Sequence, residues 1–102
     1  MGVAGNRIEL DGRLVNQPEV RVTPAGTPVL RFIVDCSTQD EELKLGVVMT
    51  GESALAAKET LRAGRQVKVS GRLRALKAGV KSIRVDAGFE VIAESVEQEE
   101  GT

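Results

Sequence analysis

Residues 6–32 read NRIELDGRLVNQPEVRVTPAGTPVLRF, and this stretch decides the fold because apolar and charged side chains alternate along it. The apolar face of the first strand consists of Ile8, Leu10 and Leu14, and the charged residues between them fall on the opposite face. Pro18 has no N–H for a ladder, so it predicts a bend or bulge within this first strand. The cluster TPAGTP that follows predicts a tight chain reversal around its glycine.

Alternation, together with the apolar content of residues 43–50, predicts four further strands, and one short helix is expected between two of them. These strands are expected over residues 29–36, 43–50 and 66–76, and in a final segment that buries Ile83, Val85, Phe89 and Val91. Before the fourth strand, Ser53 can cap a helix of about two turns. The helix is expected to bury Ala54, Ala57 and Leu61. Gly71 predicts a bend or bulge in the fourth strand.

Five strands with a bent first strand and a helix between the third and fourth match the oligonucleotide-binding (OB) fold, an all-β, partly open Greek-key barrel. At 102 residues the chain is long enough for one such domain and too short for two. From Glu94 onward it is acidic and short of apolar residues, which predicts a frayed end. We therefore expect one OB-fold domain over residues 1–93 and a disordered acidic tail over residues 94–102.

Basic residues are segregated in the sequence, although the whole chain carries a net charge of only −1. Eight cations and no acid lie in one segment: Arg62, Arg65, Lys68, Arg72, Arg74, Lys77, Lys81 and Arg84. A local positive field of this kind attracts a polyanion such as nucleic acid. A solvated strand face without a ligand is the alternative, and the charge count alone favours it.

The sequence gives no support for an enzyme, a metal protein or a membrane protein. The chain contains no His, and its acids are spread over polar strand faces and the end of the chain, so no catalytic constellation or metal site is expected. No phosphate loop or dinucleotide motif is present, so no cofactor is expected. No apolar run approaches the roughly 20 residues of a membrane helix, and no signal peptide is expected. The single Cys36 is expected to be a small buried residue in a reducing cytoplasm.

Two stretches resemble a known family. Residues 6–32 contain NR, G-x-L, P-E-x-R and T-P-x-G-x-P in the order that begins the bacterial single-stranded DNA-binding protein family, and LRAGRQVKVSGRLR at 61–74 resembles its helix-to-strand segment. The resemblance implies an OB fold that binds single-stranded DNA. Because the chain ends soon after the predicted barrel, it resembles the short, primosomal branch of the family. That branch implies a homodimer that acts in replication restart and bridges a primosomal helicase to later loading factors.

The expected DNA-binding residues lie mainly on the fourth strand and in the loop after it, a loop that OB folds use to grip nucleic acid. The full set is Arg21, Lys68, Arg72, Arg74, Lys77, Lys81 and Arg84. Base stacking is in doubt because the chain has no Trp or Tyr, and its two aromatic residues, Phe32 and Phe89, fall on apolar strand faces. Charge is therefore expected to carry most of the affinity.

Two other functions remain open. The domain could be a protein-interaction adaptor whose strand edges pair with a twin copy and whose cations meet an acidic partner. It could also be a short general single-stranded DNA-binding protein. The low aromatic content favours the adaptor, whereas the segregated cations favour DNA. The acids after Ala93 are expected either to be a passive solubilising end or to shield the basic face.

Overall fold

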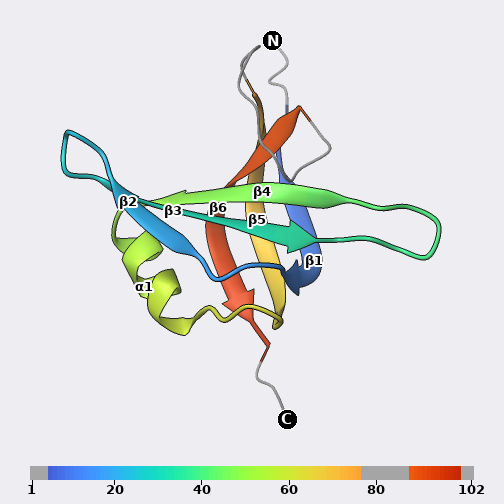
Figure 1. Ribbon diagram of the computed structural model, residues 1–102. Coiled ribbons are helices and arrows are strands. Elements are labelled where there is room, and N and C mark those ends of the chain that lie inside the picture. Colours follow the sequence, from blue (N-terminus) through green and yellow to red (C-terminus); the bar gives the residue numbers. More distant parts are fainter. Residues whose placement is uncertain (1–4, 77–87, 100–102) are drawn as a thin grey trace.

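The computed structural model describes residues 5–76 and 88–99. Within these residues the chain forms six strands and one helix (Figure 1). The elements are β1 (Ile8–Leu14), β2 (Glu19–Val22), β3 (Pro28–Asp35), β4 (Lys44–Thr50), α1 (Glu52–Thr60), β5 (Gln66–Ala75) and β6 (Phe89–Gln98). The prediction of a mostly β chain with one short helix is confirmed.

The first predicted strand is divided into β1 and β2, so the described residues form six strands instead of five. Both pieces pair antiparallel with β3. The break coincides with Pro18, whose missing N–H cannot join the ladder. Asn16 closes the gap, because its Oδ1 accepts a hydrogen bond of 2.9 Å from the backbone N–H of Ile33.

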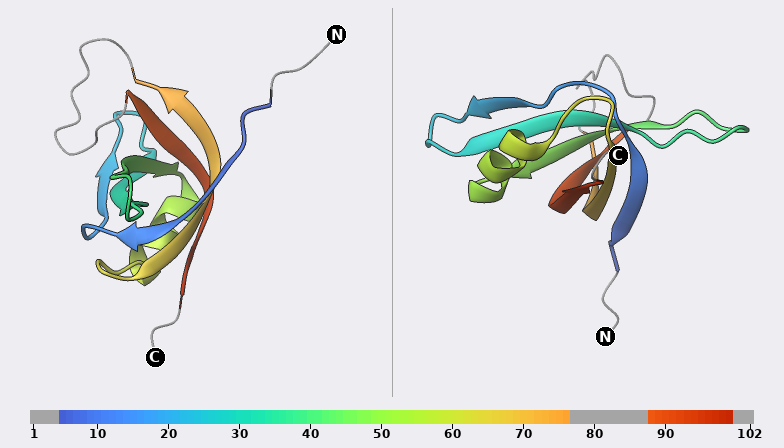
Figure 2. Two further views of the ribbon diagram at one scale, coloured as in Figure 1. Left: turned by 90° about the vertical axis from the view of Figure 1, so that its right-hand side faces the viewer. Right: turned by 90° about the horizontal axis from the view of Figure 1, so that it is seen from below.

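The sheet closes on itself. Its strand order is β1-β5-β6-β4-β3-β2, and the end of β1 also pairs with β3, so β1, β5, β6, β4 and β3 form a ring. The β4–β6 pair is parallel, and the other pairs are antiparallel. Figure 2 shows the β3–β4 hairpin extending well beyond the ring. The arrangement is consistent with the predicted OB fold.

The interior contains the apolar faces that alternation predicts. The residues no more than 2% exposed include Leu14, Leu30, Phe32, Val34, Val67, Val69 and Val91. Helix α1 adds its predicted apolar face, and Ala54 and Leu61 are almost completely buried. Ser53, however, is not the helix cap: Gly51, with a φ of 79°, turns the chain directly before the helix. The Ser53 hydroxyl instead donates to the carbonyl of Thr50 at 3.1 Å.

Gly71 brings β5 and β6 closer together than a side chain would allow. A Cβ at this position would collide with the backbone carbonyl of Ile92. The pairing of the two strands shifts between Ser70 and Gly71, where it skips Glu94 of β6. The predicted irregularity at Gly71 is therefore confirmed, with the extra residue on the partner strand.

The predicted acidic tail is wrong at its start, because β6 continues to Gln98. Residues 95–98 pair with β5, and Val96 lies opposite the fully buried Val69. The bulge at Glu94 shifts the apolar alternation by one residue. The alternating pattern that predicts a strand is therefore interrupted at Glu94, although the strand continues. Residues 94–98 therefore belong to the folded sheet, and the N–H of Glu99 still donates to the carbonyl of Gln66 at 2.9 Å.

The predicted burial of Phe89 is also wrong. This residue is 49% exposed because it is the first residue of β6, at the rim of the ring. Val91, two residues further into the strand, is fully buried as expected. The predicted core residues Ile83 and Val85 lie outside the described residues.

Candidate nucleic-acid interface

Four arginines lie on the outer side of the sheet, which we call the arginine face: Arg21, Arg31, Arg72 and Arg74. Strand register places them together. Arg31 of β3 is opposite Val48 of β4, Val48 is opposite Ile92 of β6, and Ile92 is opposite Arg72 of β5. Residues that are paired directly project from the same side of a sheet. Arg74 is two residues further along β5, and Arg21 of β2 joins the face through its partner Val29.

Glu90 lies between two of these arginines. The Nε and Nη2 atoms of Arg74 both donate to Oε1 of Glu90, the former at 3.0 Å. Nη1 of Arg31 lies 3.8 Å from Oε2. The Glu90 side chain is only 11% exposed, whereas those of Arg31 and Arg74 are 62% and 48% exposed. A buried carboxylate thus holds two accessible guanidinium groups on the same side of the sheet.

Lys68 projects from the same side of β5 as Arg72, but its surroundings are acidic. Its Nζ lies 3.5 Å from Oε1 of Glu9. Its register partners on the two neighbouring strands are Asp11 and Glu97. The structure therefore separates Lys68 from the arginine end of β5, although strand periodicity predicted one continuous basic face.

The other predicted contacts divide into two groups. Arg21 is exposed on β2, the edge strand of the sheet. Lys77, Lys81 and Arg84 lie outside the described residues.

A comparison with protein families identifies the family of the chain. The model of the single-strand binding protein family matches residues 5–98. The chain belongs to this family. Membership confirms the resemblance that the sequence motifs predict, supports the OB fold, and indicates single-stranded DNA as the ligand.

In a single-strand binding protein, an exposed aromatic ring can stack on a base. Among the described residues Phe89 is such a ring, at the start of β6 and opposite Ala75 of β5. A hydrogen bond of 2.8 Å from the N–H of Leu76 to the carbonyl of Gly88 holds the two strands together beside it. Phe89 directly precedes Glu90, so the two side chains project from opposite sides of β6, and the Phe89 ring lies at the rim and not on the arginine face itself. Phe32, in contrast, is 2% exposed, as predicted.

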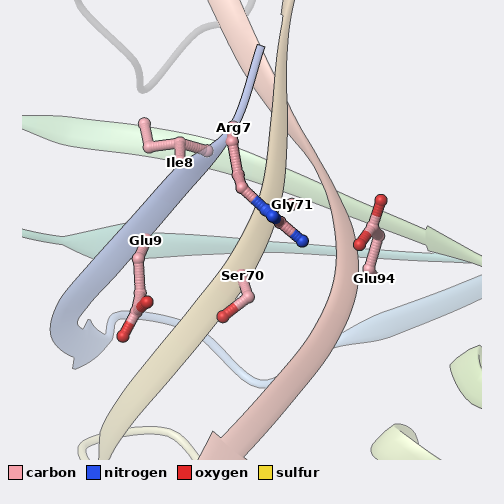
Figure 3. Close-up of a pocket in the computed structure, with 6 residues that line it drawn as sticks. All are labelled: Arg7, Ile8, Glu9, Ser70, Gly71 and Glu94. Atoms are coloured by element: carbon pink, nitrogen blue, oxygen red, sulfur yellow. The ribbon is translucent and has the colours of Figure 1, made fainter. Parts of the chain in front are cut away.

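A hollow of about 460 Å³ lies over β1, β5 and β6, and its lining is more acidic than the arginine face. Its lining consists of Arg7, Ile8, Glu9, Ser70, Gly71 and Glu94. Figure 3 shows Arg7 reaching across Gly71 toward Glu94. Because two carboxylates accompany one guanidinium, the hollow is a poor place for a phosphate. Ser70 lies between Lys68 and Arg72 on the same side of β5, so the hollow adjoins the arginine face and is its less favourable neighbour for a phosphate.

Two side chains at the base of the β3–β4 hairpin, Asp35 and Cys36, have shifted pKa values. Hydrogen bonds from Ser37 lower the pKa of Asp35, and the backbone N–H of Ser37 lies 2.9 Å from Oδ1 of that carboxylate. Burial, followed by the charges of Asp35 and Asp11, raises the pKa of the Cys36 thiol. The thiol is half-buried, not fully buried as expected, and its raised pKa makes it a poor nucleophile.

The hairpin also carries the acids Asp40, Glu41 and Glu42, which are all exposed. Its turn is closed by a 2.8 Å hydrogen bond from the N–H of Thr38 to the carbonyl of Glu41. The hairpin therefore projects negative charge away from the arginine face. No helix among residues 5–76 and 88–99 is long and apolar enough to cross a membrane.

Sequence reasoning missed Arg31 and Glu90 as site residues. Alternation does place Arg31 on the polar face of its strand, which is a usable signal. It gives no reason, however, to pair Arg31 with Arg74, because the contact depends on the β4–β6 parallel pairing between strands far apart in sequence. Alternation likewise places Glu90 on the polar side of its strand, but no local pattern links it to Arg31 or Arg74.

Proposed function

We propose that this protein binds single-stranded DNA mainly through the phosphates, on the arginine face, and serves as an accessory protein in replication restart. One observation carries the DNA part: arginines from β2, β3 and β5 share one side of the sheet in a member of the single-strand binding protein family. Arginine forms bidentate contacts with phosphate and can stack on bases. Such a face can follow a DNA backbone with few aromatic rings.

Further residues extend this interface. Phe89, at the rim where β6 begins, offers one exposed stacking surface, and a stacked base is worth about 1–3 kcal/mol. Lys77, Lys81 and Arg84 stay in the proposed interface on sequence grounds, since OB folds commonly use the loop after the fourth barrel strand. Lys68 is the weakest of the predicted contacts, because three acids surround it.

The test compares Arg72→Ala with Lys68→Ala, two cation deletions on the same face of the same strand. Binding of a labelled oligothymidylate is measured by fluorescence anisotropy at several salt concentrations. Each lost phosphate contact should flatten the slope of log K against log salt by about 0.7. We expect this flattening and weaker binding for Arg72→Ala, and near-parental values for Lys68→Ala. Equal losses in both variants would contradict the assignment to the arginine face.

The primosomal role rests on the resemblance of residues 6–32 and 61–74 to the short branch of the family, which includes primosomal replication protein N. In this role the protein is a cytoplasmic homodimer that bridges a primosomal helicase to later loading factors. Retention of a purified primosomal helicase by the tagged protein, with and without single-stranded DNA, tests the role. No retention under either condition would favour a general single-stranded DNA-binding protein.

A protein-interaction adaptor is the second candidate, and the scarcity of exposed aromatic rings among the described residues favours it. In that case the arginine face binds an acidic protein surface in place of DNA. The anisotropy titration distinguishes the two, because an adaptor would show no oligonucleotide binding near physiological salt.

A further inference from the structure

Glu90 is an unusual residue on a surface that is proposed to bind a polyanion. An acid near phosphates normally weakens their binding through repulsion. Among the residues that the structure describes, Glu90 is the charged residue that is buried, and 9% of its surface is exposed. Burial of a carboxylate is costly unless charged hydrogen-bond partners compensate. Its position and its partners therefore need an explanation beyond the packing of the core.

Glu90 contacts arginines from two strands that are not neighbours in the sheet, β3 and β5. Glu90 of β6 is paired with Arg74 on one side and with Gly46 of β4 on the other. Because Gly46 has no side chain, Arg31 can approach from β3 across β4 and place Nη1 3.8 Å from Oε2. Any larger residue at position 46 would project into this path.

The arginines also cover apolar surface on the outer side of the sheet. Val48 is only 4% exposed, yet it does not belong to the interior core cluster. It lies on the arginine face between Arg31 and Ile92 in register. Arginine stems commonly cover apolar groups while their charged heads stay in water. This packing restricts the stems, and Glu90 restricts the heads.

We propose that Glu90 is a positioning residue that presents Arg31 and Arg74 together to one phosphate of single-stranded DNA. The carboxylate engages Nε and Nη2 of Arg74 and approaches Nη1 of Arg31. Among the described residues nothing else engages the remaining N–H groups of the two guanidinium groups, so these can donate to a phosphate. The three side chains keep a net charge of +1. Holding two flexible arginines in advance reduces the entropy lost on binding. This inference rests on the proposed DNA-binding function and assigns Arg31, Arg74 and Glu90 their parts in it.

The variant Glu90→Gln separates positioning from simple neutralisation by the sign of its effect. If Glu90 only neutralises charge, removing it should tighten the binding of a labelled oligothymidylate. If it positions the arginines, binding should weaken by about threefold to tenfold, despite the gain of one positive charge. Glu19→Gln is the matched control, because Glu19 is an exposed acid on the same face, opposite Arg31 in the β2–β3 register. We expect unchanged or slightly tighter binding for that control.

A double-mutant cycle adds a readout that a purely structural role would not move. Arg31→Ala should cost less in the Glu90→Gln background than in the parent, because Arg31 has already lost its positioning there. Circular dichroism melting verifies that each variant is folded. If Glu90→Gln does not fold, Arg31→Lys replaces it: this variant keeps the charge but loses the planar guanidinium, and weaker binding is expected.

Two outcomes would overturn the inference. The first is a folded Glu90→Gln protein that binds as tightly as the parent or more tightly. The second, where that variant does not fold, is an Arg31→Lys protein with parental affinity. Arg72→Ala distinguishes these outcomes from failure of the proposed function. Weakened binding by Arg72→Ala beside an unaffected Glu90→Gln would leave the DNA-binding face in place and remove only the positioning role.

Discussion

At the scale of single residues, Gly71 sets how closely β5 and β6 approach, and it yields a stability prediction. A Cβ at position 71 would collide with the carbonyl of Ile92, so Gly71→Ala forces the two strands apart. Overpacking of this kind costs about 1–3 kcal/mol. We expect a lower urea midpoint for Gly71→Ala and little change for Gly5→Ala, where a Cβ meets nothing within 4 Å. Equal midpoints in the two variants would show that the close approach does not exist in solution.

The two phenylalanines give opposite predictions at the same scale. Phe32→Ala should lower the free energy of unfolding by about 3–5 kcal/mol, because it opens a cavity in the core. Phe89→Ala should leave stability close to the parent and weaken single-stranded DNA binding by about 1–3 kcal/mol if its ring stacks on a base. Chemical denaturation and anisotropy titration measure the two effects. If Phe89→Ala lowered stability and kept the parental affinity, the result would show that Phe89 packs against the protein and does not stack on a base.

At the scale of elements, alternation located β1, β2, β3 and β5 closely because a strand with one buried face repeats every two residues. The apolar content of residues 43–50 located β4. Alternation failed for β6, where the bulge at Glu94 shifts the repeat and an acidic composition hides the pairing of Val96 with Val69. The arginine face shows the same limit. Alternation predicts the polar side of each single strand. The contact of Arg31 with Glu90, however, depends on the pairing of β4 with β6, and no local sequence pattern predicts that pairing.

The end of β6 gives the prediction that belongs to this scale. Truncation after Ala93 would remove the residues that pair with the first half of β5, together with the Gln98 Oε1 that accepts a 2.7 Å hydrogen bond from the N–H of Arg62. We expect a large fall in the melting temperature of this truncated protein, whereas truncation after Glu99 should cost little. If the shorter protein melted at the parental temperature, residues 94–98 would be the dispensable tail that the sequence first indicated.

At the scale of the whole molecule, the near-zero net charge conceals local excesses of cations and of acids. The arginine face lies on one side of the sheet, while acids gather at the tip of the β3–β4 hairpin and around the hollow near Glu94. A field of this kind orients an approaching polyanion more than it increases total attraction. Because attraction depends on this local distribution of charge, composition alone does not identify the ligand.

The free edges of the sheet lead to the last prediction, which concerns assembly. Over Ile8–Gly12, β1 pairs with β5 on one side, and within the described residues no strand pairs with its other side. Unpaired backbone groups on such an edge can join those of a second copy, and two-fold pairing satisfies both edges at once. We therefore expect light scattering at micromolar concentration to return twice the chain mass of 10.9 kDa. A monomer mass would contradict the dimer, and it would weaken the primosomal assignment while leaving single-stranded DNA binding by each arginine face to be tested on its own.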